Sequence, residues 1–247
     1  SMIGAWVPGM RTQPLPSGIA VEIKPGEALI MQVHYHGASQ SYADQTQVGL
    51  SRSPESNPKL ISYVPLVNLR FALPPEKITD VKANHPAFLS QIMSGKILFV
   101  APHMHLLGTK TGITLELPDR TLKPLIDIPA WDFNWQGAYQ FETPVNYPKG
   151  STLHLSCRFD NTSANPNNPN NPLKTVTWGE GTNDEMCLGF VGIVPDQPPP
   201  AIFRFFAGWM RQIIPRYLPH ADPKMAVLGL LTISVGLRKA FQLKQKP

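Results

Sequence analysis

The chain has 247 residues, of which 42% are hydrophobic and only 16% charged, a composition that suits one large or two ordinary globular domains. Its net charge of +5 comes from scattered Lys and Arg residues, with no basic run interleaved with aromatic residues, which disfavours nucleic-acid binding. The 27 Pro and 18 Gly residues favour many short strands over long helices, so we expect an all-β fold.

The first 73 residues consist of short apolar segments separated by turn residues. We predict strands at residues 18–23, 28–33, 46–51 and 60–73. Two consecutive prolines at 74 and 75 mark a predicted domain boundary. Residues 1–73 are therefore assigned to a partial first β-domain, and residues 74–195 to a second.

The second domain is again predicted to be strands separated by turns, after one short helix around residues 87–93. The strands are expected near residues 97–105, 111–117, 123–128, 137–142, 151–160, 174–178 and 185–194. The Asn- and Pro-rich segment 161–171 is expected to be an exposed, mobile loop.

Residues 196–247 form a Pro-rich linker and an apolar tail, which we predict to be helical. The stretch 225–237 is mostly apolar but too short to span a bilayer. Three placements fit this tail: a helix packed on the body of the protein, on a partner subunit or on a membrane surface.

The segment 96–110, KILFVAPHMHLLGTK, holds the strongest candidate for chemistry. Its opening apolar run is typical of a buried strand and continues to His105. Since residues two apart in a strand point to the same face, His103 and His105 are expected side by side, with Met104 turned away. Two such imidazoles are half of a metal site, although a bare H-x-H is more often an ordinary pair of histidines.

Met186 is a candidate third ligand, although a lone Met in a strand usually packs in the core. Two imidazoles and one thioether suit copper in both oxidation states and suit magnesium or calcium poorly. Zinc is a weaker alternative because it prefers Cys, His or carboxylate ligands. Three protein ligands leave an open position for a small molecule, as reactive metal sites do.

Four motifs in order resemble a known family: H-M-H-L-L-G, W-x-F-N-W-Q-x-x-Y, C-x-x-D-N-T and E-M-C. They are similar to the catalytic second domain of copper type II, ascorbate-dependent monooxygenases, the relatives of peptidylglycine α-hydroxylating and dopamine β-monooxygenases, and most like the bacterial members. The resemblance covers roughly residues 98–194. It implies two antiparallel, jelly-roll-like β-sandwiches that face each other across a cleft, each with one copper, and ascorbate as the one-electron donor.

The resemblance implies ligands for both coppers. The oxygen-activating copper would be held by His103, His105 and Met186. The segment M-Q-V-H-Y resembles the end of the family's first domain, so His34 would be one ligand of the electron-transfer copper, with Gln32 beside it on the same strand face.

A disulfide between Cys157 and Cys187 beside the oxygen-activating copper is also implied by the resemblance. These are the only cysteines of the chain. A disulfide would place the protein in an oxidising compartment, so we expect a periplasmic or secreted protein, with membrane association through the tail left open.

The chain departs from the family pattern at both copper domains. No His-His dipeptide occurs, although the family's first domain supplies one, so we expect an incomplete second copper site with His36 as a less favoured substitute. Ala101 and Phe190 stand where peptide-hydroxylating members have an Arg and a Tyr that hold a substrate carboxylate. We therefore expect an apolar or aromatic substrate. His85, His154 and His220 have no motif around them and are treated as ordinary.

The sequence thus predicts a copper-dependent monooxygenase that hydroxylates a C–H bond of a small organic substrate with dioxygen and a reductant such as ascorbate. The aromatic residues Trp131, Trp135 and Tyr139 are expected to pack in the core, or else to form a wall of the substrate cleft. Asp184 and Glu185 are expected to be exposed at a strand start, with tuning of the site from behind the ligands as the alternative. The rival function is a non-catalytic or partner-completed copper-binding β-sandwich module.

Overall fold

The computed structural model describes residues 3–7, 9–11, 13–31, 33, 40–41, 43–85 and 87–198. Within this part of the chain, twelve strands and one short helix follow one another. The predicted all-β fold is therefore confirmed, and apart from residues 196–198 the tail lies outside the described residues.

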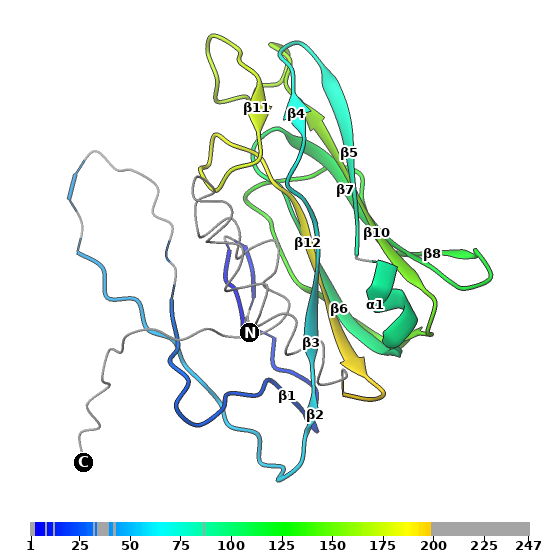
Figure 1. The fold of residues 1–247 in the computed structure, drawn as a ribbon. Coiled ribbons are helices and arrows are strands. Elements are labelled where there is room, and N and C mark those ends of the chain that lie inside the picture. The colour runs from blue at the N-terminus through cyan, green and yellow to red at the C-terminus, as the bar shows by residue number, and fades with distance from the viewer. Residues whose placement is uncertain are drawn as a thin grey trace, which may run out of the picture.

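Two four-stranded antiparallel sheets form the body of the molecule (Figure 1). The first sheet has the order β3 (Ser62–Asn68), β12 (Cys187–Pro195), β6 (Gly95–His103) and β9 (Tyr139–Tyr147). The second has the order β5 (Ile78–Asn84), β10 (Thr152–Asp160), β7 (Gly108–Glu116) and β8 (Leu122–Ile128). Apart from the β7–β8 hairpin, neighbouring strands in both sheets are far apart along the chain, so the sandwich forms only when the whole segment from residue 62 to residue 195 folds together.

The core lies between the sheets and is built by alternation along the strands. In β10 every second residue from Leu153 to Phe159 is buried, as expected of a strand with one face on a core. One of these residues, Cys157, forms a disulfide with Cys187 of β12, and the two Cα atoms are 5.9 Å apart. The disulfide implied by the family resemblance is confirmed, and it joins the two sheets.

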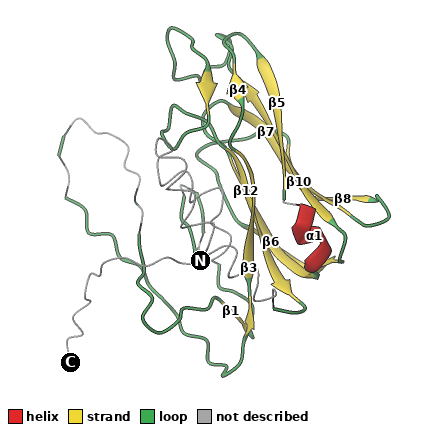
Figure 2. Cartoon of the chain, viewed as in Figure 1, coloured by secondary structure: helices red, strands yellow, loops and turns green. Residues whose placement is uncertain are grey.

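Small elements close the ends of the sandwich (Figure 2). The helix α1 (Ala87–Ile92) confirms the predicted short helix. The other elements are two pairs of two-residue strands: β1 (Ile19–Ala20) with β2 (Lys59–Leu60), and β4 (Ala72–Leu73) with β11 (Val176–Thr177).

The strands before residue 74 belong partly to this sandwich. β3 pairs along its whole length with β12, and β4 pairs with β11. The division of the chain at residue 74 stays a prediction, but the first sheet already includes seven residues that precede it.

Two predicted strands do not form. The described residues of segments 28–33 and 46–51 contain no strand, and their apolar side chains are exposed, 77% for Ile30 and 60% for Val48. Their composition favours extended backbone, but a strand also needs a hydrogen-bonded neighbour, and within the described residues neither segment has one.

The segment 161–171 differs from the exposed loop predicted for it, because its ends are held in the protein. Asn161 is fully buried and donates hydrogen bonds from Nδ2 to the carbonyl oxygens of Leu73 (2.8 Å) and Lys174 (2.9 Å). Asn168 in turn donates to Asn161 Oδ1 at 2.9 Å. The Asn side chains replace missing backbone partners, as this residue type often does in turns.

In the described part of the chain, no helix is long and apolar enough to cross a membrane.

Candidate metal centre

The strand β6 ends at His103, two residues earlier than predicted. Met104 is fully buried in the core, so it points away from the two histidines as expected. The rings of His103 and His105 lie edge to face with centroids 5.1 Å apart. The strand stops because the backbone N–H groups of His105 and Leu107 donate to the Glu185 side chain instead of to a neighbouring strand.

His103 is oriented by Gln136, the glutamine of the W-x-F-N-W-Q motif. Nδ1 of His103 lies 2.5 Å from Oε1 of Gln136, and Nε2 of Gln136 donates to the carbonyl oxygen of Phe133 at 2.8 Å. Since the Gln136 amide already uses its N–H on Phe133, Oε1 accepts the proton of His103 Nδ1. The neutral ring therefore carries its lone pair on Nε2, the nitrogen available to a metal.

His105 is oriented in the same way by a backbone group. Its Nδ1 donates to the carbonyl oxygen of Asp184 at 2.9 Å, and its ring packs edge-on against Phe133 with centroids 6.1 Å apart. A carbonyl oxygen only accepts hydrogen bonds, so the lone pair of this ring is also on Nε2. Both imidazoles are held in the tautomer that metal-binding histidines use when a protein acceptor fixes Nδ1–H.

The electrostatics of His103 favour its neutral form. Burial, with a smaller contribution from the neighbouring His105, lowers the pKa of His103 to about 4, and the hydrogen bond to Gln136 opposes this shift. The ring is therefore neutral at pH 7. A neutral imidazole is the form that binds a metal without first losing a proton.

Glu185 is fully buried, so the expectation that it is exposed at a strand start is wrong. Its Oε2 accepts from the N–H groups of His105 (2.9 Å) and Met186 (3.1 Å), and its Oε1 accepts from Leu107 N–H at 2.6 Å. Burial raises the pKa of Glu185 to about 7, while the backbone N–H donors act in the opposite direction. Its carboxylate thus holds the loop after β6 against the strand that carries Met186.

Met186 is buried and packs with Trp178 and Leu188. Leu188 lies directly opposite His103 in the β12–β6 pair. Since residues two apart on a strand share a face, Met186 belongs to the same side of the sheet as His103. The disulfide at Cys187 adjoins it, so the structure brings the three predicted ligands to one end of the first sheet.

The same face carries Ala101 and Phe190, where the family resemblance predicts the loss of a carboxylate-binding pair. Phe190 lies directly opposite Ala101 in the β12–β6 pair, one step along the face from Leu188 and His103. Both are partly buried and neither side chain has a polar group. This part of the face therefore offers apolar contacts beside the histidines.

The aromatic block divides between core and surface. Trp131 and Tyr139 pack against the core, as expected. Trp135 is 64% exposed, so the prediction that it packs in the core is wrong. The block's contribution at the site comes instead from Phe133 and Gln136, which contact His105 and His103.

The donor set fits copper better than a harder cation. No cluster of three His, Cys, Asp or Glu side chains that could hold a metal occurs among the described residues. Two imidazoles beside a buried thioether remain, and such a borderline and soft set suits copper. His34, Gln32 and His36, proposed around the second copper, lie outside the described residues, so the structure places the candidate ligands of one metal only.

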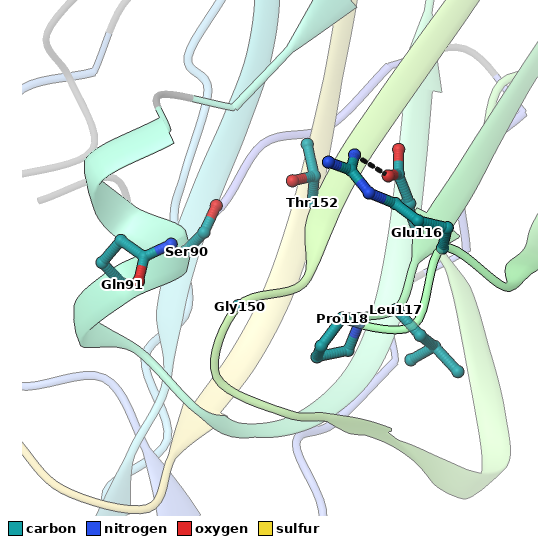
Figure 3. Close-up of a pocket in the computed structure, with 8 residues that line it drawn as sticks. Ser90, Gln91, Glu116, Leu117, Pro118, Gly150 and Thr152 are labelled. Atoms are coloured by element: carbon teal, nitrogen blue, oxygen red, sulfur yellow. Dashed lines mark hydrogen bonds and ion pairs between the residues drawn. The ribbon is translucent and has the colours of Figure 1, made fainter.

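A separate pocket of about 360 Å³ lies at the other end of β7, away from the histidine pair (Figure 3). Its charged groups are already paired, since Arg120 donates to Glu116 at 2.6 Å. The lining residues are Ser90, Gln91, Glu116, Leu117, Pro118, Arg120, Gly150 and Thr152.

Comparison with protein families identifies one match. Residues 74–196 match the family described as "Copper type II ascorbate-dependent monooxygenase, C-terminal domain". No curated protein matches the chain. The matched range contains both histidines of the pair, Met186 and the disulfide.

Proposed function

Because residues 74–196 of the chain belong to the C-terminal domain of the copper type II, ascorbate-dependent monooxygenases, we propose that the protein is such a monooxygenase, with His103, His105 and Met186 as copper ligands. Copper would supply dioxygen activation and one-electron chemistry at this site. The protein's own residues would hold the metal, orient the substrate and limit access of water.

The observation that carries the proposal is the fixed tautomer of both imidazoles. Gln136 and the Asp184 carbonyl each accept a hydrogen bond from Nδ1 of a different ring. Both Nε2 atoms are thereby prepared as metal donors before any metal arrives, which reduces the reorganisation needed on binding.

The apolar face beside His103 supports a small apolar or aromatic substrate. Ala101 and Phe190 offer no charged or hydrogen-bonding side chain, and a carboxylate buried against them would be left unpaired. A substrate placed here would present a C–H bond beside the histidines and rely on apolar contacts for its orientation.

The family and the disulfide support a proposal for the reductant and for the compartment. The family is ascorbate-dependent, so we propose ascorbate or a similar one-electron donor. The disulfide is compatible with an oxidising compartment, and we propose the periplasm or the exterior of the cell.

Copper titration of the wild-type protein, Met186→Ala and Met93→Ala tests the ligand set. Met93 is the matched control, because it is a buried Met in the core near α1. We expect the wild type to bind Cu(I), and Met186→Ala to bind it about 10-fold or more weakly because the soft ligand is lost. Met93→Ala should keep wild-type affinity while losing about 2–5 kcal/mol of stability. Absence of copper binding by the wild type, or equal affinity in all three proteins, would contradict the assignment.

A second candidate, a module completed by a partner chain, is favoured by the exposed apolar residues before β3. Leu29, Ile30 and Met31 are 48%, 77% and 50% exposed, and Val48 and Leu50 are 60% and 54% exposed. Unpaired apolar segments of this kind are suited to adding strands from another chain. If the copper-loaded protein consumes no dioxygen with ascorbate and an aromatic substrate, this function replaces monooxygenase activity of the chain alone.

A further inference from the structure

Met186 lies between two anchored residues. On one side, Cys187 is bonded to Cys157 of the opposite sheet. On the other side, the backbone of Glu185 donates from N–H to the carbonyl oxygen of Thr177 and accepts from Gly179 N–H, both at 3.2 Å. The thioether therefore projects from a backbone segment with little freedom to move.

The Glu185 side chain connects this segment to the loop that carries His105. Its two oxygens accept different hydrogen bonds. Oε1 accepts from the backbone N–H of Leu107, and Oε2 accepts from the backbone N–H groups of His105 and Met186. His105 lies 80 positions from Glu185 along the chain, whereas Met186 is its immediate neighbour. All three partners are N–H donors, so the site needs two acceptor oxygens.

We propose that Glu185 is a positioning residue that sets the spacing between the His105 imidazole and the Met186 thioether, so that both reach one copper ion. This inference rests on the proposed function, since it takes copper as the ligand. The two ligands lie just beyond the paired residues, because the last β12–β6 pair joins Leu188 to His103 and neither strand extends further. Beyond that pair, the Glu185 carboxylate connects the two segments, together with the hydrogen bond from His105 Nδ1 to the Asp184 carbonyl oxygen.

The variant Glu185→Gln separates positioning from a general contribution to folding. An amide has nearly the same shape as the carboxylate but only one acceptor oxygen, so it can keep the Leu107 contact or the His105 and Met186 contacts, but not both. The imidazoles keep their own acceptors, Gln136 and the Asp184 carbonyl. In either orientation the amide NH2 of the variant side chain would face at least one of the backbone N–H groups, so the loop and the Met186 segment should move apart. We therefore expect the histidine ligands to remain and the thioether to be displaced.

X-ray absorption spectroscopy of the Cu(I)-loaded protein measures this directly. The wild type should show a sulfur scatterer in addition to imidazole nitrogen, and Glu185→Gln should lose the sulfur and keep the nitrogen. Cu(I) affinity, measured against a chromophoric chelator, should fall about 10-fold or more in the variant.

Tyr147→Phe is the control for a loss of buried hydrogen bonds elsewhere. Tyr147 pairs with Gly95 at the first residue of β6, and His103 is the last residue, so the two ends are roughly 26 Å apart at about 3.3 Å per residue. The Tyr147 hydroxyl contacts His85 and the Ser151 carbonyl. Its removal should lower the melting temperature and leave the sulfur scatterer and the affinity unchanged.

The possible failures are distinguishable. A wild-type protein without copper would end the proposed function. A wild type that binds copper through sulfur, together with a Glu185→Gln protein that keeps the sulfur at unchanged affinity, would overturn only the role of Glu185. If Glu185→Gln does not fold, Glu185→Asp decides: it keeps two acceptor oxygens but is one methylene shorter. It should bind Cu(I) about 3-fold or more weakly if the spacing matters, and equal affinity would overturn the proposal.

Discussion

His85 and His103 both have a pKa lowered to about 4 by burial, and they lie at opposite ends of the sandwich. His85 contacts Tyr147, the partner of the first residue of β6, and His103 is the last residue of that strand. The lowered pKa therefore does not separate a structural histidine from a candidate ligand.

Hydrogen-bond partners make the difference. At His85 the Leu153 N–H donates to Nδ1 (3.1 Å), so the proton lies on Nε2, which donates to the Tyr147 oxygen (2.8 Å). The Tyr147 hydroxyl then donates to the Ser151 carbonyl oxygen (3.2 Å). Both ring nitrogens of His85 are used by the protein, whereas His103 uses Nδ1 and carries its lone pair on Nε2. The proton position, set by one partner, distinguishes the two ends.

The largest expected effect is on copper binding when a histidine is removed at each end. His105→Ala should weaken Cu(I) binding about 100-fold or more, because it removes one of two imidazole donors. His85→Ala should leave the Cu(I) affinity within about 2-fold. It should cost about 1–3 kcal/mol of stability, because the Leu153 N–H and the Tyr147 hydroxyl lose their hydrogen bonds to the ring. Chelator competition measures the affinity, and urea unfolding measures the stability. Comparable copper loss in the two variants would break the distinction between the ends.

The pH dependence of folding should sharpen the comparison in the metal-free protein. The folded pKa of His85 is about 4, below the ordinary value of 6.5. As the pH falls below 6.5, His85 binds a proton in the unfolded chain but not in the folded protein. The stabilising contribution of neutral His85 is therefore present above pH 6.5 and is lost as the pH falls towards 4. A shift of this size corresponds to about 3 kcal/mol.

Urea unfolding between pH 7 and pH 4.5 checks this expectation. The wild type should lose stability on acidification, and His85→Gln should lose less because the titrating group is gone. The same slope in both proteins would show that His85 does not contribute in this range.

The smallest expected effect concerns the groups that fix each tautomer. Gln136→Leu removes the acceptor of His103 Nδ1 and should weaken Cu(I) binding about 10-fold. Tyr147→Phe removes the corresponding partner of His85 and should cost about 1 kcal/mol of stability without changing copper affinity. Thermal unfolding and copper titration of both variants test the pair. A copper effect in Tyr147→Phe, or none in Gln136→Leu, would contradict the role assigned to the partners.

The sequence alone determined much of the fold, because alternation of apolar residues is a local property. The strand at residues 152–160 follows from that alternation and the strand at residues 95–103 from a continuous apolar run, and each lies within about two residues of its predicted bounds. The predictions at 28–33 and 46–51 were wrong because composition favours extended backbone but does not supply the neighbouring strand that a sheet requires.

At the site, the sequence determined which residue types stand together in motifs, and the H-x-H spacing already predicted two adjacent rings. Only the tertiary structure decided how those rings are held. Gln136 lies 33 positions from His103, and the partners of His105 lie 79 and 80 positions away. A hydrogen bond between distant segments depends on how the sheets close on each other, and no local pattern specifies that. For the same reason the sequence predicted Glu185 to be exposed at a strand start. Folding instead buries its carboxylate between the two segments that carry the proposed ligands.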